Sequence, residues 1–411
     1  MSRSLTLFLF YAAKVLANLA VYAFIPLLPL YLDSQQASPV QIGIFFSCMA
    51  LARLVMGLIG GWLADSVGHL RSLVMGSLSG LFAFLAILWA PSWQWALLGM
   101  FLINVAASLT TPSQAAFIAG FVTERRGRAF AVMNTIQSLA LVLGPTVGGW
   151  LVERQGFDGL LWFSSALYGL AILIRFSLMR DAPAQAAGQV REGFRASLRG
   201  MRSLIVGGGL LAVMLMTDGF HDISASLTET YQPLFLSHAG LAVGQIGLVA
   251  SIAALTTLLS HTLSGWLVDR RGEKTPMFLS AALAGVGISV FLLARSFAGY
   301  ALAWGLYGLT EGLAVTAFDS LISKAVPPAR RGMAYGLFST AQGLFSLPVP
   351  ILGGWLYTIS PAAPMIGAAL TAVMSVFVIW SRFPGGHLAD YTEAADTEET
   401  PGRLEAEAAP A

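Results

Sequence analysis

Long continuous apolar runs limit the fold of this sequence more than any other feature. Each run has about 20 residues or more, enough to cross about 30 Å of hydrocarbon as a helix, and is bounded by Pro, Gly or charged residues. Strands of a membrane barrel would instead alternate in segments of about ten residues. The runs predict twelve membrane-spanning helices at residues 5–32, 40–63, 71–90, 95–119, 129–152, 160–179, 204–236, 244–268, 276–294, 300–323, 333–357 and 362–381.

The composition agrees with a membrane protein. Hydrophobic residues make up 56% of the chain and charged residues 11%, whereas soluble proteins carry about 25% charged residues. Twelve spans fill most of the 411 residues and leave no room for a sizeable soluble domain. The single cysteine, Cys48, excludes a disulfide framework and a cysteine metal cluster.

The placement of basic residues predicts the orientation. Most of the 23 Lys and Arg residues, with Arg175 counted among them, are assigned to loops on one side and to the termini. Basic residues favour the cytoplasmic side, so we expect both termini in the cytoplasm, in the inner membrane of a bacterium. The predicted domains are a six-helix bundle at 1–180, a cytoplasmic loop at 181–203, a second bundle at 204–381 and an acidic, disordered tail at 382–411.

The two predicted bundles repeat each other. At an offset of 204 residues, Gln41-Ile42-Gly43 aligns with Gln245-Ile246-Gly247, and the Gly-Trp-Leu-x-Asp run at 61–65 aligns with that at 265–269. At 205, Gln137 aligns with Gln342 and Pro145 with Pro350. Several matches in one order indicate two halves of equal topology, related by an axis along the membrane normal.

The loops after the second and eighth spans resemble the signature loop of the major facilitator superfamily, in particular its 12-span drug:proton antiporters. The resemblance implies that these loops hold the cytoplasmic side shut when the other side is open. The first loop has Ser66, His69 and Leu70 where the family usually has basic residues. An alternative is that the loop residues only cap helices and fix topology. The predicted gating residues are Gly61, Asp65, Gly68 and Arg71 in the first loop, and Gly265, Asp269, Arg270 and Gly272 in the second.

The fifth span carries Gly144, Pro145, Gly148 and Gly149, which is similar to the Gly-Pro-x-x-Gly-Gly antiporter motif of proton-driven exporters in this family. Pro bends a helix and Gly allows a neighbouring helix to approach closely. The upstream Gly of the longer motif is missing, and the eleventh span has a related sequence at 348–354. Flexible helix packing alone is the alternative explanation.

Ionisable residues inside the spans are the candidates for proton coupling, because a charge in mid-bilayer costs about 2.5–3.5 kcal/mol and needs a cavity, a partner or a task. They are Lys14, Asp218, His221, Asp222, Glu311 and Asp319. In the resembling family these residues lie on spans that line the central cavity. The offset of 204 aligns Lys14 with Asp218 and Asn18 with Asp222, which predicts pairing of Lys14 with Asp218 across the cavity. A static ion pair with no transport role is the alternative.

Four further polar residues are predicted to contact substrate in that cavity: Asn18, Tyr22, Thr111 and Gln114. Tyr22 can stack on a hydrophobic cation. The hydroxyl and amide groups beside Pro112 can either meet substrate or bond to preceding carbonyls. Arg53, on a non-lining span, is expected to be structural.

The sequence contains no P-loop and neither of two common hydrolase motifs, HExxH and GxSxG, so we expect no enzymatic activity and no cofactor. The predicted function is proton-coupled export of small hydrophobic or organic compounds by alternating access. The alternative is a symporter or uniporter that imports a sugar or organic anion. A membrane enzyme or receptor is a weaker alternative. The expected partners are a small-molecule substrate, protons and the lipid bilayer, without nucleic acid, and the protein is expected to be a monomer.

Overall fold

The structure is a computed structural model that describes residues 3–122, 126–181, 209–325 and 340–382. Every regular element in these ranges is helical, and residues 340–346 are helical as well. The first half contains α1 (Arg3–Phe24), η1 (Ile25–Leu27), α2 (Leu28–Ser34), α3 (Pro39–Val67), α4 (His69–Leu88), α5 (Trp93–Phe121) and α6 (Arg126–Asp181). The second half contains α8 (Gly209–His238), α9 (Val243–Arg271), α10 (Lys274–Leu293), α11 (Phe297–Ala325), α13 (Val349–Ile359) and α14 (Ala363–Arg382).

Each predicted span contains a described helix, with three differences in detail. The fifth and sixth spans form the single element α6, which joins two helices at Gly156, where φ is 70° and ψ is −177°. The first span is interrupted by η1, which contains a proline. The eleventh span is broken by a turn at 347–348 before α13 begins. The expected loop at 181–203 and tail at 382–411 lie, except for Asp181 and Arg382, outside the described residues.

By length and composition, eight stretches of the described helices can cross a membrane. The more polar α8 and α11 are not among them. These two helices carry five of the six candidate proton-coupling residues: Asp218, His221, Asp222, Glu311 and Asp319. A polar spanning helix needs protein or water beside it rather than lipid, so the candidate site must lie in the interior.

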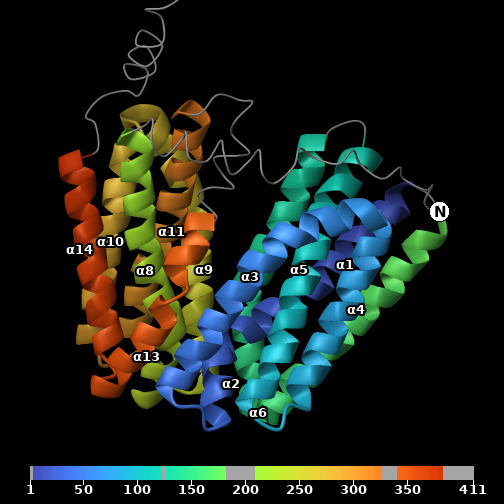
Figure 1. Ribbon diagram of the computed structural model, residues 1–411, viewed down its shortest axis with the longest axis horizontal. Coiled ribbons are helices and arrows are strands. Elements are labelled where there is room, and N and C mark those ends of the chain that lie inside the picture. Colours follow the sequence, from blue (N-terminus) through green and yellow to red (C-terminus); the bar gives the residue numbers. More distant parts are fainter. Residues whose placement is uncertain (1–2, 123–125, 182–208, 326–339, 383–411) are drawn as a thin grey trace, which may run out of the picture.

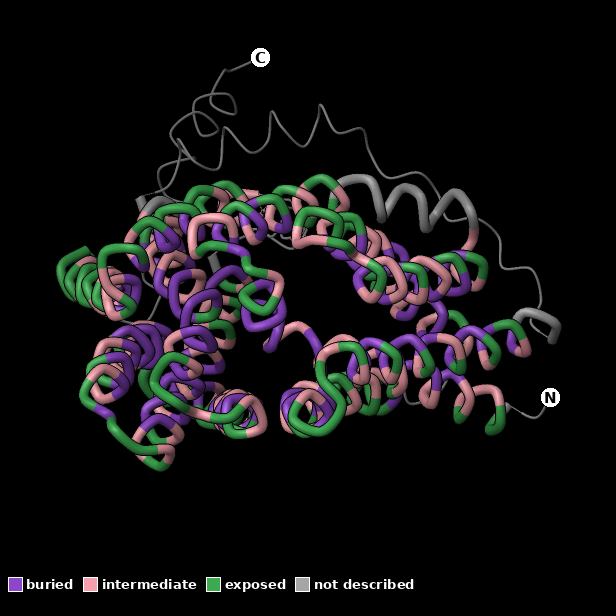
Figure 2. Tube along the Cα trace, turned by 90° about the horizontal axis from the view of Figure 1, so that it is seen from below, coloured by how far each residue is buried: buried purple, intermediate pink, exposed green. Residues whose placement is uncertain are grey.

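Among the described residues, the two halves pack together mainly toward one end. We call the end that contains Arg3, Asp181, Gly209 and Arg382 the terminal end, and the opposite end the distal end. The ribbons of the halves meet at the distal end and diverge toward the terminal end (Figure 1). Figure 2 shows buried segments where the halves meet.

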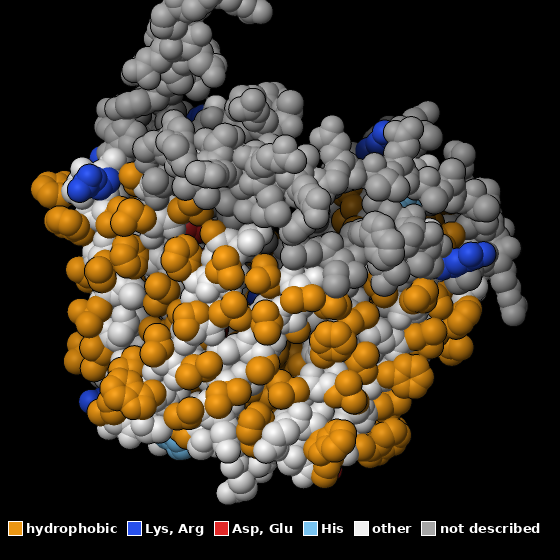
Figure 3. All heavy atoms as spheres, in the orientation of Figure 1, with side chains coloured by type: hydrophobic (Ala, Val, Ile, Leu, Met, Phe, Trp, Pro, Cys, Tyr) orange, Lys and Arg blue, Asp and Glu red, His pale blue; other side chains and the backbone are white. Residues whose placement is uncertain are grey.

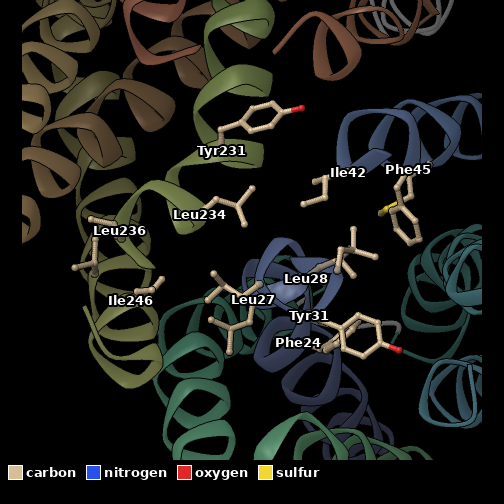
Figure 4. Close-up of a cluster of buried hydrophobic side chains, with 14 of the residues drawn as sticks. Phe24, Leu27, Leu28, Tyr31, Ile42, Phe45, Tyr231, Leu234, Leu236 and Ile246 are labelled. Carbon is tan, nitrogen blue, oxygen red and sulfur yellow. The ribbon is translucent and has the colours of Figure 1, made fainter. Parts of the chain in front are cut away.

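The hydrophobic cores have the same distribution. One large core at the distal end takes side chains from both halves, including Phe24 and Leu28 of the first half and Tyr231 and Ile246 of the second (Figure 4). Two separate smaller cores lie toward the terminal end. One belongs to the first half and contains Phe10 and Phe117, and the other belongs to the second half.

Two helix crossings close the distal end, and they are equivalent under the repeat. A Cβ atom at Gly43 of α3 would collide with the carbonyl oxygen of Pro350 in α13. Equally, a Cβ atom at Gly247 of α9 would collide with the carbonyl oxygen of Pro145 in α6. The second glycine of each Gly-Gly pair, Gly149 in α6 and its equivalent in α13, adds another close backbone approach between the halves. Pro145 and Gly149 of the antiporter-like motif therefore lie in the contact between the halves, whereas Gly144 and Gly148 pack against the backbone of Tyr22 and Ala23 within the first half.

The polar bonds at these crossings differ between the two sides. At the α6–α9 crossing, the Thr146 backbone N–H and hydroxyl donate to Ser251 Oγ at 3.1 and 2.7 Å. At the α3–α13 crossing, the Tyr231 hydroxyl donates to the carbonyl oxygen of Pro350 instead. Gly244 N–H at the start of α9 also donates to Glu153 Oε1 at 2.9 Å.

Large apolar side chains cover the outside of the helices. Hydrophobic side chains occupy most of the visible face below the grey region in Figure 3. Exposed examples include Leu173, Leu293, Phe377 and Trp380. Such a continuous apolar surface far exceeds the patches that soluble monomers expose, as expected for a surface that faces lipid.

The distal contact should depend on the missing side chain at Gly247. We expect Gly247→Val to separate the α6–α9 crossing, because overpacking costs about 1–3 kcal/mol, a shift of about 5- to 150-fold in a two-state equilibrium. The measurement is the disulfide yield between Thr146→Cys and Ser251→Cys in a Cys48→Ser background. Gly285→Val on α10 is the matched control, because a Cβ there meets nothing within 4 Å. Equal yields in both variants would contradict the prediction.

Candidate functional site

Acidic and imidazole side chains of α8 and α11 form the centre of the candidate site. His221 Nε2 of α8 lies 3.1 Å from Glu311 Oε1 of α11, which is an ion-pair distance. Asp218, one turn before His221, interacts electrostatically with both of these groups. Three predicted residues are therefore brought together, two by their spacing along α8 and the third by the packing of α11 beside them.

Asp222 occupies the same face one turn along α8 and has a partner that the sequence analysis did not assign to the site. Its Oδ1 accepts a hydrogen bond of 2.9 Å from Gln342 Nε2 in the 340–346 segment. The side chain is buried, at 9% exposure. Its second oxygen, Oδ2, has no hydrogen-bond partner among the described residues. One carboxylate oxygen of a buried acid is thus free to bind a proton or to accept a hydrogen bond from another donor.

Lys14 of α1 forms a separate polar cluster in the first half. Its side chain is 4% exposed, and Nζ donates to Gln114 Oε1 at 2.9 Å and to Gln137 Oε1 at 3.5 Å. Gln137 Nε2 donates in turn to the hydroxyl of Tyr22 at 3.4 Å. Of the predicted substrate-contacting residues, Gln114 therefore bonds the buried ammonium directly, and Tyr22 is linked to it through Gln137.

The predicted pairing of Lys14 with Asp218 is wrong for this conformation. Lys14 donates to Gln114 and Gln137 of its own half, and Asp218 interacts with His221 and Glu311 of its own half. Gln137 beside Lys14 and Gln342 beside Asp222 are equivalent under the repeat. The alignment of these two glutamines at an offset of 205 was the available signal. A glutamine can accept from an ammonium or donate to a carboxylate, so one residue type serves opposite charges.

Arg175 was assigned to a loop, but it lies inside α6 at 5% exposure. Its guanidinium donates to the carbonyl oxygen of Leu73, at 3.1 Å, and to the hydroxyl of Ser77 on α4. It also interacts electrostatically with Lys14. The first half therefore holds two neighbouring buried cations, whereas the second half holds the acidic cluster.

The remaining predicted residues are less closely associated. Thr111 and Asp319 are exposed, and the amide nitrogen of Asn18 is buried without a hydrogen-bond partner among the described residues. Glu229 of α8 interacts electrostatically with Glu311 and with Arg53 of α3, so Arg53 of the first half lies near the acidic cluster.

The two signature loops lie at the terminal end. Both loops turn on a glycine in the left-handed region, Gly68 with φ 92° and Gly272 with φ 73°, which other residues rarely adopt. The side chains of Gly61 and Asp65 lie outside the described part of α3. Arg71 is exposed. In the second loop, Gly265 has open space around it and the Arg270 guanidinium lies 4.5 Å from the centroid of the Trp266 ring.

Glu273, directly after Gly272, forms an ion pair that the sequence analysis missed. Its Oε1 lies 2.6 Å from Lys324 Nζ and accepts a hydrogen bond of 2.8 Å from Ser320. Both partners belong to the last turns of α11, so the loop is fixed to its own half. Burial of the carboxyl acts to raise its pKa, but the bonds from Lys324 and Ser320 outweigh it, and the pKa of Glu273 lies below its usual value.

Comparison with known proteins identifies the family. The model of the Major Facilitator Superfamily matches residues 10–242 and 219–405. The chain belongs to the Major Facilitator Superfamily. It is 24% identical to a Na(+), Li(+), K(+)/H(+) antiporter of Planococcus maritimus, over 81% of this chain and 85% of the relative. It is 24% identical to a multi-drug resistance efflux pump PmrA homolog of Lactococcus lactis, over 87% and 89% of the two chains.

The fold agrees with solved structures of transporters. The crystal structure of the nucleoside transporter NupG superposes with a TM-score of 0.76 at 16% identity, covering 93% of this chain and 98% of that chain. The predicted fold of two pseudo-symmetric helical bundles is therefore confirmed, and with it the class of secondary transporter.

The ion pair between Glu273 and Lys324 makes the stability of the folded protein depend on pH. Because the pKa of Glu273 is lowered in the folded protein, its stabilisation is present above about pH 4.5 and is lost as the pH falls through the lowered pKa. We expect Glu273→Gln to lower the melting temperature by a few degrees at pH 7 and to match the parent below about pH 4, in detergent melting curves. Asp269→Asn, an exposed carboxylate in the same loop, is the control. If Glu273→Gln lowers the melting temperature by the same amount at both pH values, the prediction is wrong.

Proposed function

We propose that this protein is a proton-coupled exporter of small hydrophobic or organic compounds that works by alternating access between its two halves. The observation that carries the proposal is the acidic cluster of α8 and α11 on one side of the molecule, opposite a buried ammonium on the other. The antiporter and the efflux pump to which the chain is similar support proton exchange and export.

The conformation supports alternating access. The halves share a core at the distal end and have separate cores toward the terminal end, which corresponds to a carrier closed on one side. The α3–α13 and α6–α9 crossings are backbone contacts between glycines and carbonyl oxygens. Such contacts can separate without breaking many side-chain bonds, so a rocking motion needs little rearrangement inside either half.

The acidic cluster supports proton coupling. Asp222 has one oxygen held by Gln342 and one without a partner among the described residues, and His221 and Glu311 form an ion pair beside it. Protonation of a carboxylate in this cluster removes one negative charge, which weakens attraction for a cationic compound and permits its release. Lys14 is a fixed positive charge in the first half. Its repulsion disfavours a state in which a cationic compound and a proton are bound between the halves at the same time.

We further propose that the terminal end faces the cytoplasm of a bacterial cell, because the described basic residues Arg71, Arg270, Arg271 and Lys324 lie at this end. Export then requires binding at the terminal end and release at the distal end. Both halves belong to one chain, so a monomer provides the complete pathway. The 1–180 and 204–381 segments act as the moving bodies.

The test uses purified protein in liposomes with a trapped pH dye and an imposed proton gradient. Tetraphenylphosphonium, a sugar and an organic acid are added separately to wild type and to Asp222→Asn. We expect tetraphenylphosphonium to trigger proton flux in wild type and at least a tenfold slower flux in Asp222→Asn, because the variant cannot carry the proton. Solute movement without proton flux in wild type would contradict the proposal and favour the uniporter.

Asp319→Asn is the matched control, because this exposed carboxylate lies two turns from Glu311 on the same helix. It should keep wild-type flux. If Asp222→Asn also keeps wild-type flux while Glu311→Gln loses it, the proton carrier is Glu311, and the assignment to Asp222 is wrong.

A further inference from the structure

A pocket inside the second half adjoins the acidic cluster. It is enclosed by α8, α10, α11 and α14 (Figure 1), all of which belong to one half, so it is separate from the contact between the halves. Residues from the first turn of α10, such as Met277, to the middle of α8 line it. The pocket thus extends from near the terminal end toward the level of the cluster. Its polar lining consists of Thr217, Asp218, His221, Ser224, Ser280 and Ser375.

The repeat shows why a pocket exists here. The same pair of positions is bonded in both halves, with donor and acceptor exchanged. Ser164 donates to the carbonyl of Ala20, whereas Ser224, the equivalent of Ala20, donates to the carbonyl of Ala368, the equivalent of Ser164. This pairing of positions agrees with an offset of 204 for these helices. In the first half, Tyr168 packs on Gly80 and is buried. Its equivalent in the second half is Ala372, which lines the pocket.

A second large side chain is replaced in the same way. Arg175 fills the interior of the first half and is bonded to Leu73 and Ser77. Its equivalent is Ile379, and the equivalent of Ser77 is Ala281. Both of these lining residues lack polar groups and leave the space that a guanidinium takes in the other half.

At other positions, small residues without polar side chains in the first half are replaced by polar residues in the second half. Five positions that carry no side-chain polar group in the first half carry one in the second. The five first-half residues are Ala13, Ala17, Ala20, Gly76 and Ala171, and their second-half equivalents are Thr217, His221, Ser224, Ser280 and Ser375. Loss of two large side chains together with gain of five polar groups converts a packed interior into a polar pocket.

The size of the pocket selects its occupant. It offers about 30 Å³ to the centres of water-sized spheres, and one water molecule needs about 10–15 Å³ on this measure. The pocket therefore accepts about two water molecules, whereas drug-sized ligands need several hundred Å³ of space. Ser224 and Ser280 already donate to backbone carbonyls, so their oxygen lone pairs are free to accept from water.

We propose that this pocket holds water molecules that carry protons between the terminal end and Asp218 and His221, on a path inside the second half. In this step the Asp218 carboxylate takes a proton from a pocket water, and that water regains one from the next water toward the terminal end. The residues that α10 and α14 contribute to the lining are not ionisable. Asp218 faces His221 and Glu311, with Asp222 on the same helix. The inference rests on the proposed proton coupling, and it assigns the protons an entry route that is separate from the space between the halves.

The test measures protonation of Asp218 directly, without substrate. After a rapid pH drop, infrared absorption of protonated carboxyl groups is followed in purified protein, and the Asp218 band is the one lost in Asp218→Asn. Ala372→Phe restores an aromatic ring at the position of Tyr168 and fills the pocket. We expect it to slow the appearance of the Asp218 band at least tenfold, with an unchanged final amplitude.

Val373→Phe is the matched control, because this neighbouring side chain on α14 is 59% exposed and does not line the pocket. In this variant, Asp218 should become protonated at the wild-type rate. Ser280→Ala combined with Ser375→Ala keeps the packing but removes two hydroxyls, and we expect a rate severalfold below wild type. This variant keeps the test valid if Ala372→Phe does not fold.

A wild-type rate in a folded Ala372→Phe protein, or in the double serine variant if Ala372→Phe does not fold, would overturn the proposal. Loss of the band on replacing choline chloride with sodium chloride would also overturn it and identify a bound cation instead of water. The liposome assay of wild type tests proton-coupled transport separately. A carrier without proton flux but with pocket-dependent protonation of Asp218 would refute the function and leave the hydrated pocket intact.

Discussion

The close approach of helix backbones at the distal end is the contact on which the rest of the structure depends. Gly43 and Gly247 allow α3 and α9 to reach the carbonyl oxygens of Pro350 and Pro145 across the boundary between the halves. A side chain at either glycine would hold the halves apart. Because lipid is as apolar as the helices, close packing and backbone contacts, rather than hydrophobic burial, hold membrane helices together. The shared distal core and the separate terminal cores follow from this single line of contact.

Equivalence of the two halves makes their differences informative. The repeat preserves the crossings and the left-handed glycines of the signature loops. It also preserves the pair of positions bonded between Ser164 and Ala20 and between Ser224 and Ala368, with donor and acceptor exchanged. It does not preserve the charges. The first half buries Lys14 and Arg175, whereas the second half carries the acids and has a pocket where the first half has an arginine and a tyrosine. The first half therefore has a packed interior with fixed positive charge, and the second has the acidic groups that we propose exchange protons.

Much of the fold was predictable from local sequence, because a spanning helix must satisfy its own backbone within one continuous apolar run. The approximate positions of the described helices followed from this, whereas the repeat and the family followed from motifs that match between the two halves. The site was predictable only in part. Asp218, His221 and Asp222 share a helix face by spacing alone, but the Glu311 contact needs the packing of α11 on α8. The Lys14–Asp218 pairing failed because equal depth in two halves does not imply contact: Lys14 donates to glutamines of its own half, and Asp218 lies near His221 and Glu311 of its own half.

By itself, the sequence determined that the chain crosses a membrane many times, that it repeats, and that the candidate proton-coupling residues inside the spans lie on α1, α8 and α11. Each of these properties is a matter of composition and spacing along one chain. Only the tertiary structure decided which end is closed, which groups hold Lys14 and Asp222, and that Arg175 is buried rather than in a loop. It also decided that Glu273 is paired and that a pocket lies behind Asp218. These features depend on distances between helices that are far apart in the chain, and such distances are set by the packing of small side chains such as Gly43, Gly247 and Ala372.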